Sequence, residues 1–416
     1  MHIPDKWRVL SAGFVSYMFD AVEIIALTIA IPVLMLALDM STSEAGFLVT
    51  ATLLGIGCSS VLVGWYADNY GRQKALLLCL VSFGALTAAV ALAETWLQIV
   101  VLRFLAGLGL GGLWGVVAAY IAESWPERQR ARATSFVLSS FPVGAGLAAG
   151  IAALVLPVYG WRMLFLVCGL GSVALAAILY FYLPESPGWA RQRELAARAG
   201  KPATVSVREI FAPGLLRHTI LGTLAAAFAL TAYWGSTTWL PTYLVKERGL
   251  SVETMALFVV ILNVGMFIGY NVFGYIADVI GKRRAIILSL MGTVVTLPLY
   301  MLVRDHTALL WLGPVYAFFI SFAGLFGAYF AQLYPTHVRA TGAGFCFNAG
   351  RGVSAFAPFV LGWIASQYGL ATGIALCAGF FLLSAITVFF MPDGDLHAAQ
   401  AAATPDKAPS TILEHP

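Results

Sequence analysis

The sequence predicts an all-α membrane protein with twelve transmembrane helices arranged as two six-helix repeats. Of its 416 residues 60% are hydrophobic and only 11% are charged, whereas roughly a quarter of the residues in a soluble domain are charged. The mean hydropathy is +0.86, and the 41 glycines suit closely packed membrane helices. Twelve apolar segments are long enough to cross a bilayer, and a motif in the first half returns near 210 residues later.

The apolar segments follow one another along the chain, with ends fixed to within a few residues. They are residues 9–38, 45–67, 75–93, 97–121, 134–156 and 163–183, then 219–243, 255–277, 285–303, 309–331, 342–366 and 371–391. The first segment is too long for a signal peptide, carries acids and is followed by no small-residue cleavage site. We therefore expect it to be a membrane helix.

One sizeable polar stretch, at 184–218, divides the apolar segments into two groups of six. It begins Pro-Glu-Ser-Pro-Gly-Trp and continues with Arg, Glu, Ala and Lys, which is typical of a short amphipathic piece on the membrane surface. We expect a first half at 1–183, a cytoplasmic linker at 184–218, a second half at 219–391 and a disordered cytoplasmic tail at 392–416.

The placement of lysine and arginine predicts the orientation. With the N-terminus inside, eighteen of the 24 Lys and Arg residues fall in cytoplasmic segments and four on the opposite side. The other two, Arg103 and Arg351, lie inside helices. The positive-inside rule then places both termini in the cytoplasm. We expect a multi-pass protein of the cell inner membrane, because the helical spans are not preceded by a transit peptide.

Two stretches of the first half recur in the second. Gly-Trp-Tyr-Ala-Asp-Asn-Tyr-Gly-Arg-Gln-Lys at 64–74 matches Gly-Tyr-Ile-Ala-Asp-Val-Ile-Gly-Lys-Arg-Arg at 274–284, and Tyr120 matches Tyr329. The nearly constant offset indicates a duplication. Each copy enters the membrane from the same side, so the repeats are parallel and a substrate site is expected between them near the midplane.

The repeated loop, G-x-x-x-D-x-x-G-R-x-K, resembles the signature loop of the major facilitator superfamily. Arg103, after Leu102 and before glycines 107, 109 and 111, is similar to that superfamily's helix-4 motif. The run 184–187, Pro-Glu-Ser-Pro, resembles the end of the first half in its sugar and organic-acid porters. The resemblance covers most of the chain and implies the major facilitator fold.

A closer resemblance is to the aromatic-acid and metabolite proton symporters, whose first helix carries D-G-x-D. Asp20-Ala21-Val22-Glu23 keeps both acids at that spacing, with Ala for Gly and Glu for the second Asp. Residues 239–244, Trp-Leu-Pro-Thr-Tyr-Leu, and 348–352, Asn-Ala-Gly-Arg-Gly, are also similar to that group. The resemblance implies proton-coupled symport, and the changes in the first helix leave the substrate class open.

Asp20 and Glu23 are the candidates for proton coupling, with Arg103 as their partner. The two acids share one helix face in the middle of the first apolar segment, where an acid costs a few kcal/mol unless it faces the protein interior or a wet cavity. Arg103 reaches a similar depth, so a bidentate carboxylate partner is expected. In the resembling porters a helix-1 acid pairs with this arginine, and protonation would release it. The alternative is a static ion pair that fixes helix packing.

Arg351 and Asn348 are the candidates for binding a carboxylate. They lie one turn apart on one helix face and offer a charged fork and an amide donor. No acid lies in the same or the neighbouring helices. The anion that Arg351 needs is therefore the substrate or, as the alternative, Asp20 or Glu23 across the cavity.

Several other side chains are expected near the level of the cavity. The aromatic ones are Tyr17, Trp114, Tyr233, Trp234, Trp239, Tyr270 and Tyr316, and the polar ones are Asn263 and Asn271. Most aromatic residues in such a chain pack in the interior or form interfacial belts. We select Trp114 and Trp234 for stacking on a flat substrate, with Tyr17, Tyr233 and Asn271 as further substrate contacts. The asparagines can equally bond to a neighbouring helix.

Charged residues at the cytoplasmic helix ends form a candidate gate. They are Asp68, Arg72, Glu123, Arg130 and Arg132 in the first half and Asp278 and Lys282 in the second. Carboxylates there can accept from the N-terminus of a facing helix and pair with basic loop residues. The resemblance to the superfamily implies a latch that stabilises the outward-facing state and breaks when the protein opens inward.

We therefore expect a secondary active transporter that takes up a small organic anion, an aromatic or short-chain carboxylate, with protons by alternating access. The alternatives are uptake of nicotinate or a sugar, efflux of drugs or metabolites and, outside transport, a membrane sensor. Drug/proton antiporters have a Gly-Pro pattern in the fifth helix, and Phe141 precedes Pro142 here. No metal-ligand cluster or nucleophile elbow is present in the sequence. We expect no enzyme activity, no metal, no cofactor and no nucleic-acid partner, and a monomer in the lipid bilayer.

Overall fold

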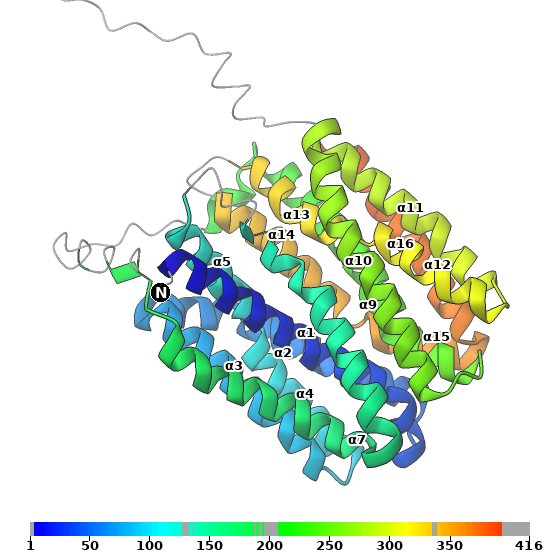
Figure 1. Ribbon diagram of the computed structural model, residues 1–416. Coiled ribbons are helices and arrows are strands. Elements are labelled where there is room, and N and C mark those ends of the chain that lie inside the picture. The colour runs from blue at the N-terminus through cyan, green and yellow to red at the C-terminus, as the bar shows by residue number, and fades with distance from the viewer. Residues whose placement is uncertain are drawn as a thin grey trace, which may run out of the picture.

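The structure, a computed structural model, describes residues 4–126, 133–134, 136–186, 189–190, 194, 207–334 and 339–392. These residues form a bundle of long helices that lie side by side (Figure 1). None of the described residues is in a strand, so the expected all-α class is confirmed.

The helices follow the order of the predicted segments. Those of the first half are α1 (Asp5–Ala37), α2 (Thr42–Tyr70), α3 (Arg72–Ala89), the 3-10 turn η1 (Val90–Leu92), α4 (Trp96–Leu110), α5 (Leu113–Ser124) and α7 (Ser140–Tyr182). Those of the second half are the 3-10 turn η2 (Val207–Phe211), α9 (Leu216–Lys246), α10 (Val252–Ile280), α11 (Lys282–Leu302), α12 (His306–Phe319), α13 (Phe322–Gln332), α14 (Arg339–Ser354), α15 (Ala357–Tyr368) and α16 (Leu370–Phe389).

The helices account for all twelve predicted membrane segments. Nine helical stretches of the described residues are long and apolar enough to cross a membrane. One of them, Phe136–Tyr182, contains two predicted segments, because α7 is broken at Gly160, where φ is +73°. The remaining two segments correspond to α2 and to the consecutive pair α14 and α15.

The two halves begin their helices in the same way. Ser41 and Ser251, 210 residues apart, cap α2 and α10, and each side chain accepts from the main-chain N–H three residues on. Thr95 and Asp305 cap α4 and α12 with the same offset and the same bond. The duplication that the sequence indicates is therefore also present in the local structure.

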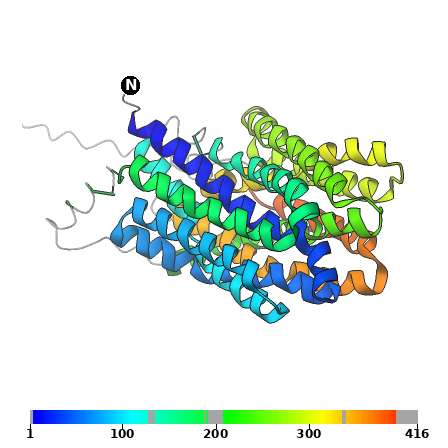
Figure 2. The ribbon, with the colours of Figure 1, turned by 60° about the horizontal axis from the view of Figure 1, so that its bottom comes forward.

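The halves meet along two helix pairs, in which α7 packs against α10 and α2 packs against α15. Both ribbon views show α1 lying along α7 (Figures 1 and 2), and α1 also contacts α9 of the second half. The α2–α15 contact is close, because a Cβ added at Gly46 would lie 2.5 Å from Pro358 O and 2.9 Å from the Trp239 ring. The middle of α1, which carries the two acids, is therefore enclosed at the junction of the halves.

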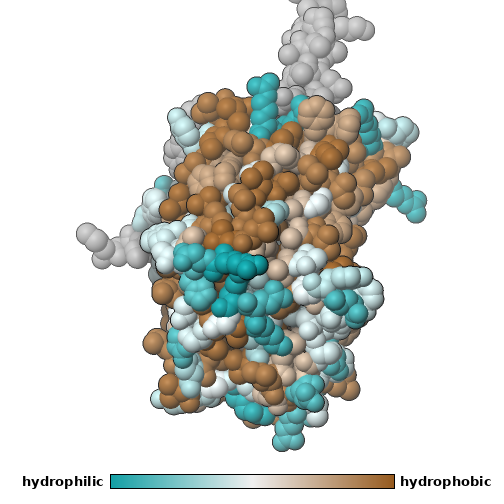
Figure 3. Space-filling view, turned by 90° about the vertical axis from the view of Figure 1, so that its right-hand side faces the viewer, coloured by the Kyte–Doolittle hydropathy of each residue, from teal (hydrophilic) through white to brown (hydrophobic). Residues whose placement is uncertain are grey.

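Apolar side chains cover much of the outside of the bundle. Figure 3 shows a face with broad hydrophobic areas, on which hydrophilic residues lie across the middle and at several places along the edge. Large exposed side chains include Trp311 at 63% and Leu302 at 73% exposure. A soluble monomer rarely shows so much continuous apolar surface, whereas acyl chains of a bilayer would cover it.

Candidate functional site

Both acids of α1 are buried in the middle of the bundle. Asp20 is 4% exposed and Glu23 is fully buried. The helix around them, from Asp20 through Pro32, is buried on all sides. A helix that is apolar around its whole circumference is enclosed by other helices, so the two carboxylates cannot reach the surrounding lipid.

Arg103 is also fully buried, and three acceptors from three helices hold its guanidinium. Nη1 donates to Thr87 Oγ1 on α3 at 2.9 Å, Nε donates to Thr52 Oγ1 on α2 at 3.3 Å, and Nη2 donates to the main-chain carbonyl of Glu23 at 3.2 Å. The reach to α2 depends on Gly107, where a Cβ would lie 2.2 Å from Thr52 O. Gly107, one turn beyond Arg103 on α4, therefore lets α4 approach α2 closely.

This geometry corrects one expectation. Arg103 makes no ion pair with a carboxylate within the described part of the chain, so the bidentate partner predicted from its depth is wrong. Two hydroxyl groups and a helix carbonyl satisfy the guanidinium instead. Arg103 thus ties α1, α2, α3 and α4 together through groups that do not ionise.

Glu23 points into the first half. Ser172 Oγ on α7 donates to Glu23 Oε1 at 2.7 Å, and Thr87, which accepts from Arg103, also lies close to the Glu23 carboxyl group. The second carboxylate oxygen, Oε2, is buried and has no hydrogen-bond partner among the described residues. The Glu23 side chain therefore extends from α1 between α3, α4 and α7. One carboxylate oxygen accepts a hydrogen bond, and the other accepts none from the described residues.

Asp20 is the acid that meets the second half. Its carboxylate interacts electrostatically with Arg351 on α14 and with Glu23 one turn along α1. The same arginine acts on Tyr17 of α1 and on Tyr233 of α9. Arg351 is half-buried, and within the described residues its guanidinium makes no hydrogen bond or ion pair. A cation faces an acid here without a bond that would fix either of them.

Aromatic rings surround this pair of charges. Tyr17 and Trp114 have ring centroids 5.0 Å apart, and Tyr233 and Trp234 have centroids 5.1 Å apart. Tyr270 of α10 interacts with both Tyr17 and Tyr233. Tyr17 and Tyr233 thus lie near Arg351, and rings from α5, α9 and α10 lie next to these two tyrosines. We call Asp20, Arg351, Tyr17, Tyr233, Tyr270, Trp114 and Trp234 the central cluster.

Other predicted residues do not join the central cluster. Asn271 is exposed on the α10 face that also exposes Val264 and Ile268, and its amide donates to Phe267 O at 2.9 Å. Polarity within an apolar segment suggested a cavity position, but the helical angle points Asn271 to the outside. Asn263 is buried and likewise donates to its own helix.

Two aromatic residues have structural partners. Trp239 donates to Pro358 O at 3.0 Å in the α2–α15 contact, and Tyr316 bonds to Ser236 at 3.1 Å. Asn348 lies one turn from Arg351 and is exposed. Gly352 lies one turn further on the same side of α14, and a Cβ added there would have no other atom within 4 Å. This side of α14 therefore faces open space, and Asn348 stays a candidate.

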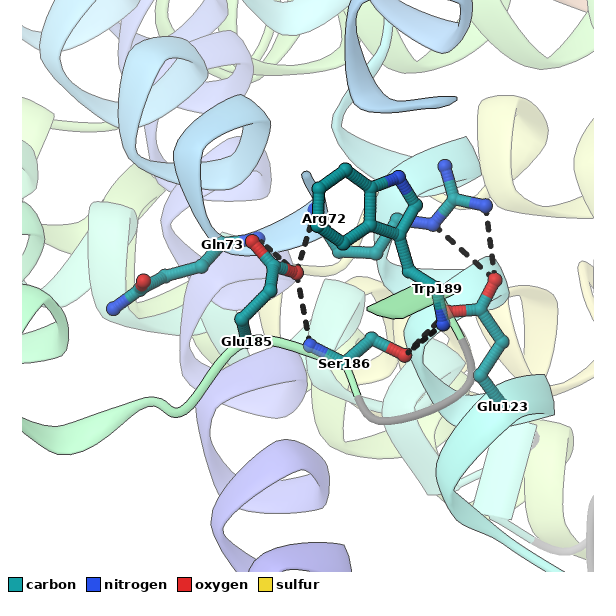
Figure 4. A network of polar contacts seen from close by, with 6 residues as sticks. All are labelled: Arg72, Gln73, Glu123, Glu185, Ser186 and Trp189. Carbon is teal, nitrogen blue, oxygen red and sulfur yellow. Dashed lines mark hydrogen bonds and ion pairs between the residues drawn. The ribbon is translucent and has the colours of Figure 1, made fainter. Parts of the chain in front are cut away.

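A second polar network lies at the end of the bundle where α3 begins and α5 ends. Arg72 Nη2 lies 2.9 Å from Glu123 Oε1, and Ser186 Oγ donates to Glu123 Oε2 at 2.5 Å. Glu185 Oε1 accepts from the main-chain N–H groups of Arg72, Gln73 and Ser186. Figure 4 shows these groups with Trp189, whose main-chain N–H donates to Ser186 Oγ. We call this set the α3 cap network. The Glu185 carboxylate occupies the N-terminus of α3, where the helix dipole favours negative charge.

The corresponding end of the second half is built differently. Asp278 is exposed, and Lys282 starts α11 half-buried. Arg130 and Arg132 lie outside the described residues, as does the side chain of Asp68, so this part of the predicted gate stays a prediction. Most of the linker and nearly all of the tail also lie outside them.

Sequence reasoning missed the hydroxyl groups of the site. Thr52, Thr87 and Ser172 hold Arg103 and Glu23, and no pattern in the sequence separates them from other hydroxyl residues in apolar segments. Glu185 and Ser186 stood in the quoted Pro-Glu-Ser-Pro run, which gave a signal for their place but not for their contacts. Among the residues that the structure describes, no group of His, Cys, Asp and Glu could hold a metal ion.

Comparisons with known proteins concern the chain as a whole. A family model described as the Major Facilitator Superfamily matches residues 9–353. A putative metabolite transport protein of Haemophilus influenzae is 31% identical over 395 residues, which cover 93% of this chain and 96% of that protein. A cis,cis-muconate transport protein of Acinetobacter baylyi is 28% identical over 385 residues, which cover 92% of this chain and 93% of that protein.

Solved structures show the same fold. A crystal structure of a D-xylose-proton symporter has a TM-score of 0.77 to this structure, with coverage of 93% of this chain and 98% of that one. The two sequences are 18% identical, so the likeness concerns the arrangement of helices alone.

Proposed function

The chain belongs to the Major Facilitator Superfamily, and from this premise we propose that it takes up a small organic anion together with protons. The chain is a multi-pass membrane transporter with the twelve-helix fold of that superfamily. The observation that carries the proposal for the anion is Arg351, a half-buried guanidinium with no bonded partner in the described residues, near Tyr17 and Tyr233.

The substrate class follows from what the central cluster offers. A guanidinium prefers a planar carboxylate, which it binds through two parallel hydrogen bonds. The rings of Tyr17, Trp114, Tyr233 and Trp234 supply flat apolar surface for an aromatic or unsaturated body. A relative named for transport of cis,cis-muconate, a planar carboxylate, supports the same choice. We therefore propose an aromatic or short-chain carboxylate, with nicotinate as the first alternative.

Proton coupling follows from competition for one cation. Ionised Asp20 attracts Arg351, and so does the carboxylate of a substrate. When Asp20 takes up a proton, Arg351 loses its internal anion and binds the substrate more tightly. When Asp20 releases the proton, it displaces the substrate. Substrate and proton then bind together, which is the thermodynamic requirement for symport.

The remaining acid and arginine have supporting roles in this proposal. Arg103 holds the four helices around Glu23, and Glu23 is a second proton site whose open oxygen Oε2 can carry the proton. Protonation of Glu23 leaves the bond from Ser172 intact at Oε1. Arg103 bonds the main-chain carbonyl of Glu23 and not its carboxylate, so protonation of Glu23 does not release Arg103 in this proposal.

The cytoplasmic charges are proposed to control which side opens. In this proposal Asp68, Asp278, Lys282 and Arg130 act between the halves, and the α3 cap network of Arg72 and Glu123 stiffens the first half. In this proposal the protein lies in a bacterial inner membrane with both termini in the cytoplasm. It acts as a monomer, whose two halves, 1–183 and 219–391, are joined by the linker. The non-transport alternative, a membrane sensor, would bind the same anion without moving it.

Flux measurements with the purified protein in proteoliposomes test the proposal. We expect benzoate to accumulate inside vesicles with an alkaline interior, and we expect a protonophore to abolish the accumulation. Nicotinate and lactate rank the carboxylates, and a hexose serves as the neutral control. Accumulation of the hexose without any carboxylate would refute the anion assignment. Binding of benzoate without flux under any gradient would favour the sensor.

Arg351→Lys is the matched variant for the binding site. Lysine keeps the charge and loses the planar fork, so we expect weaker benzoate transport with the pH dependence retained. Unchanged affinity for every carboxylate in this variant would remove Arg351 from the site.

A further inference from the structure

Four donors stand in line on α9, at positions i, i+4, i+8 and i+12. They are Trp234, Thr238, Thr242 and Lys246. The first three are at most 3% exposed, and within the described residues Trp234 Nε1, Thr238 Oγ1 and Thr242 Oγ1 have no hydrogen-bond partner. A hydroxyl in a helix ordinarily donates to the carbonyl four residues back, as Ser236 on the same helix does at 2.7 Å.

The line joins the central cluster to the surface. At its inner end the Trp234 ring contacts Tyr233, with centroids 5.1 Å apart. At its outer end Lys246 is exposed in the last turn of α9, and its ammonium group lies 3.6 Å from Met35 Sδ of α1. Lys246 makes no ion pair within the described residues. A cation without an acid thus stands at the mouth of a row of buried donors.

The opposite wall adds a fourth unpaired donor, which is a hydroxyl group of the first half. Thr50 on α2 is fully buried, and its Oγ1 has no partner in the described part of the chain. It follows Gly46 by one turn on the helix face that meets Pro358 and the Trp239 ring of the second half. Helix α2 begins after Ser41 and helix α9 ends at Lys246, and these two helix ends lie at the same end of the bundle. Each half therefore has unpaired donors in the part of the bundle near that end.

Buried polar groups without partners are rare in native proteins and call for an explanation. Here Thr50 lies on the face of α2 that meets the second half, and the other three lie on α9, which contacts α1 of the first half. A transporter of this family must separate the two halves on the outer side. Separation would hydrate all four donors at once. Thr50, Trp234, Thr238 and Thr242, between Lys246 and Arg351, would then offer donors to a passing anion throughout its path. Residues 234–246 of α9 include no acid that would repel such an anion.

We propose that the outer part of the junction, lined by Thr50, Trp234, Thr238 and Thr242 and entered beside Lys246, is the external passage for a carboxylate substrate. In this structure the passage is closed. The inference rests on the proposed function, since it names the path by which the same anion reaches the central cluster. It also makes the unpaired donors a device that disfavours the closed outer junction, because closure desolvates them without compensation.

Cysteine accessibility tests the passage directly. We would introduce Thr238→Cys or Thr242→Cys into a Cys58→Ser background, because Cys58 is exposed whereas the other four native cysteines are buried. A membrane-impermeant thiol reagent is then added outside intact cells. We expect both thiols to react. Excess benzoate at acid external pH should change their rate of reaction several-fold, because the substrate redistributes the open and closed states.

Ser236→Cys is the matched control. Ser236 lies on the same helix and is 1% exposed, but its hydroxyl faces Tyr316 in the core of the second half. We expect no reaction there. Equal reaction of Thr238→Cys and Ser236→Cys, whether high or low, would overturn the passage. If wild-type protein transports benzoate and Thr238→Cys stays unreactive, the passage is wrong and the function stands. If no carboxylate is transported at all, the function fails whatever the labelling shows.

A second variant tests the energetic part. Thr242→Val has the same shape and removes one unpaired hydroxyl, so it should stabilise the closed junction. We expect the reaction of Thr238→Cys with the external reagent to slow by about fivefold or more when Thr242→Val is added, given the usual penalty of an unpaired buried donor. Thermal stability in detergent should stay equal or rise. An unchanged or faster reaction would overturn the claim that these hydroxyls disfavour closure.

Discussion

The two halves of this transporter share a backbone plan and differ in the groups that they bury. Tyr120 and Tyr329 donate to the carbonyls of Pro184 and Pro392 at 2.5 and 2.8 Å, in corresponding places. The duplicated positions around Arg103 do not correspond in chemistry. At an offset of 210, Thr52, Thr87 and Arg103 become Leu262, Leu297 and Gly313. The first half therefore buries a polar cluster where the second half buries apolar side chains.

The arginines show the consequence of this difference. Arg103 is fully buried and bonds three fixed acceptors, whereas Arg351 is half-buried and bonds none in the described residues. A guanidinium that fixed groups satisfy stabilises the fold around it. One that is left open beside an acid is available to a mobile anion. In the proposed mechanism the halves therefore have different roles, since the first holds the proton sites in place and the second supplies the cation for the substrate.

The largest effect is expected at Arg103. Replacing it by Met removes three hydrogen bonds and leaves Thr52, Thr87 and the Glu23 carbonyl unsatisfied. We expect a loss of roughly 3 kcal/mol or more in the stability of the folded protein, together with loss of uptake. Thermal unfolding in detergent measures the first and proteoliposome flux the second. Gly313→Ala is the control at the duplicated position, because its Cβ would meet only ordinary contacts of 3.5 Å or more. Equal stability of the two variants would contradict the comparison.

Arg351→Met should separate function from stability. Because this guanidinium has no bonded partner in the described structure, thermal stability should stay within about 0.5 kcal/mol of the wild type. Benzoate binding should weaken by about 10- to 100-fold, which is the usual range for a lost charge-assisted hydrogen bond. The KM for uptake and the unfolding temperature, measured on one preparation, decide the matter. A variant that unfolds early with an unchanged KM would place Arg351 with Arg103 as a structural residue.

The two acids of α1 sharpen the comparison within one helix. Raising the pH ionises Asp20, which then competes for Arg351, so benzoate affinity in the wild type should fall as pH rises. Asp20→Asn cannot compete. Its affinity should stay high at all pH, exchange should continue, and accumulation driven by a pH gradient should be lost. Glu23→Gln can still accept from Ser172 and should retain the pH dependence of affinity. Affinity is measured by equilibrium binding between pH 5 and 8. Loss of pH dependence in Glu23→Gln alone would exchange the two roles.

The fold could be predicted because the bilayer sets the length of an apolar segment, and because the duplication repeats the same loop motif between corresponding helices. The charged members of the site were also visible, since an arginine or acid within an apolar run is conspicuous. Their bonding was not. Thr87 and Ser172 look like any hydroxyl residue in a membrane helix, and only the packing of α3 and α7 against α1 makes them partners of Arg103 and Glu23.

Helix rotation set a second limit on prediction from the sequence. Asn271 and Asn263 are both polar residues in one apolar segment, but they lie on different faces of α10, one exposed and one buried. Segment boundaries uncertain by a few residues cannot fix that angle. The partner of Trp239 was also beyond prediction, because Pro358 comes from a helix 119 residues further along.

The smallest effect is expected in the α3 cap network, where the comparison between halves meets the gate. Arg72 and Glu123 have side chains 8% and 14% exposed and a contact of 2.9 Å, while Gln332 stands 209 residues after Glu123. The contacts of Glu123 with Arg72 and Ser186 all lie within the first half and the segment that follows it. Glu123→Gln, which copies the second half, should therefore lower stability by about 1 kcal/mol. It should also leave the external reaction of Thr238→Cys unchanged within about twofold. A larger change in that reaction would show that the network acts as a latch between the halves. Thr238 lies far from the network along the bundle, so its accessibility can change only through a shift between inward- and outward-open states.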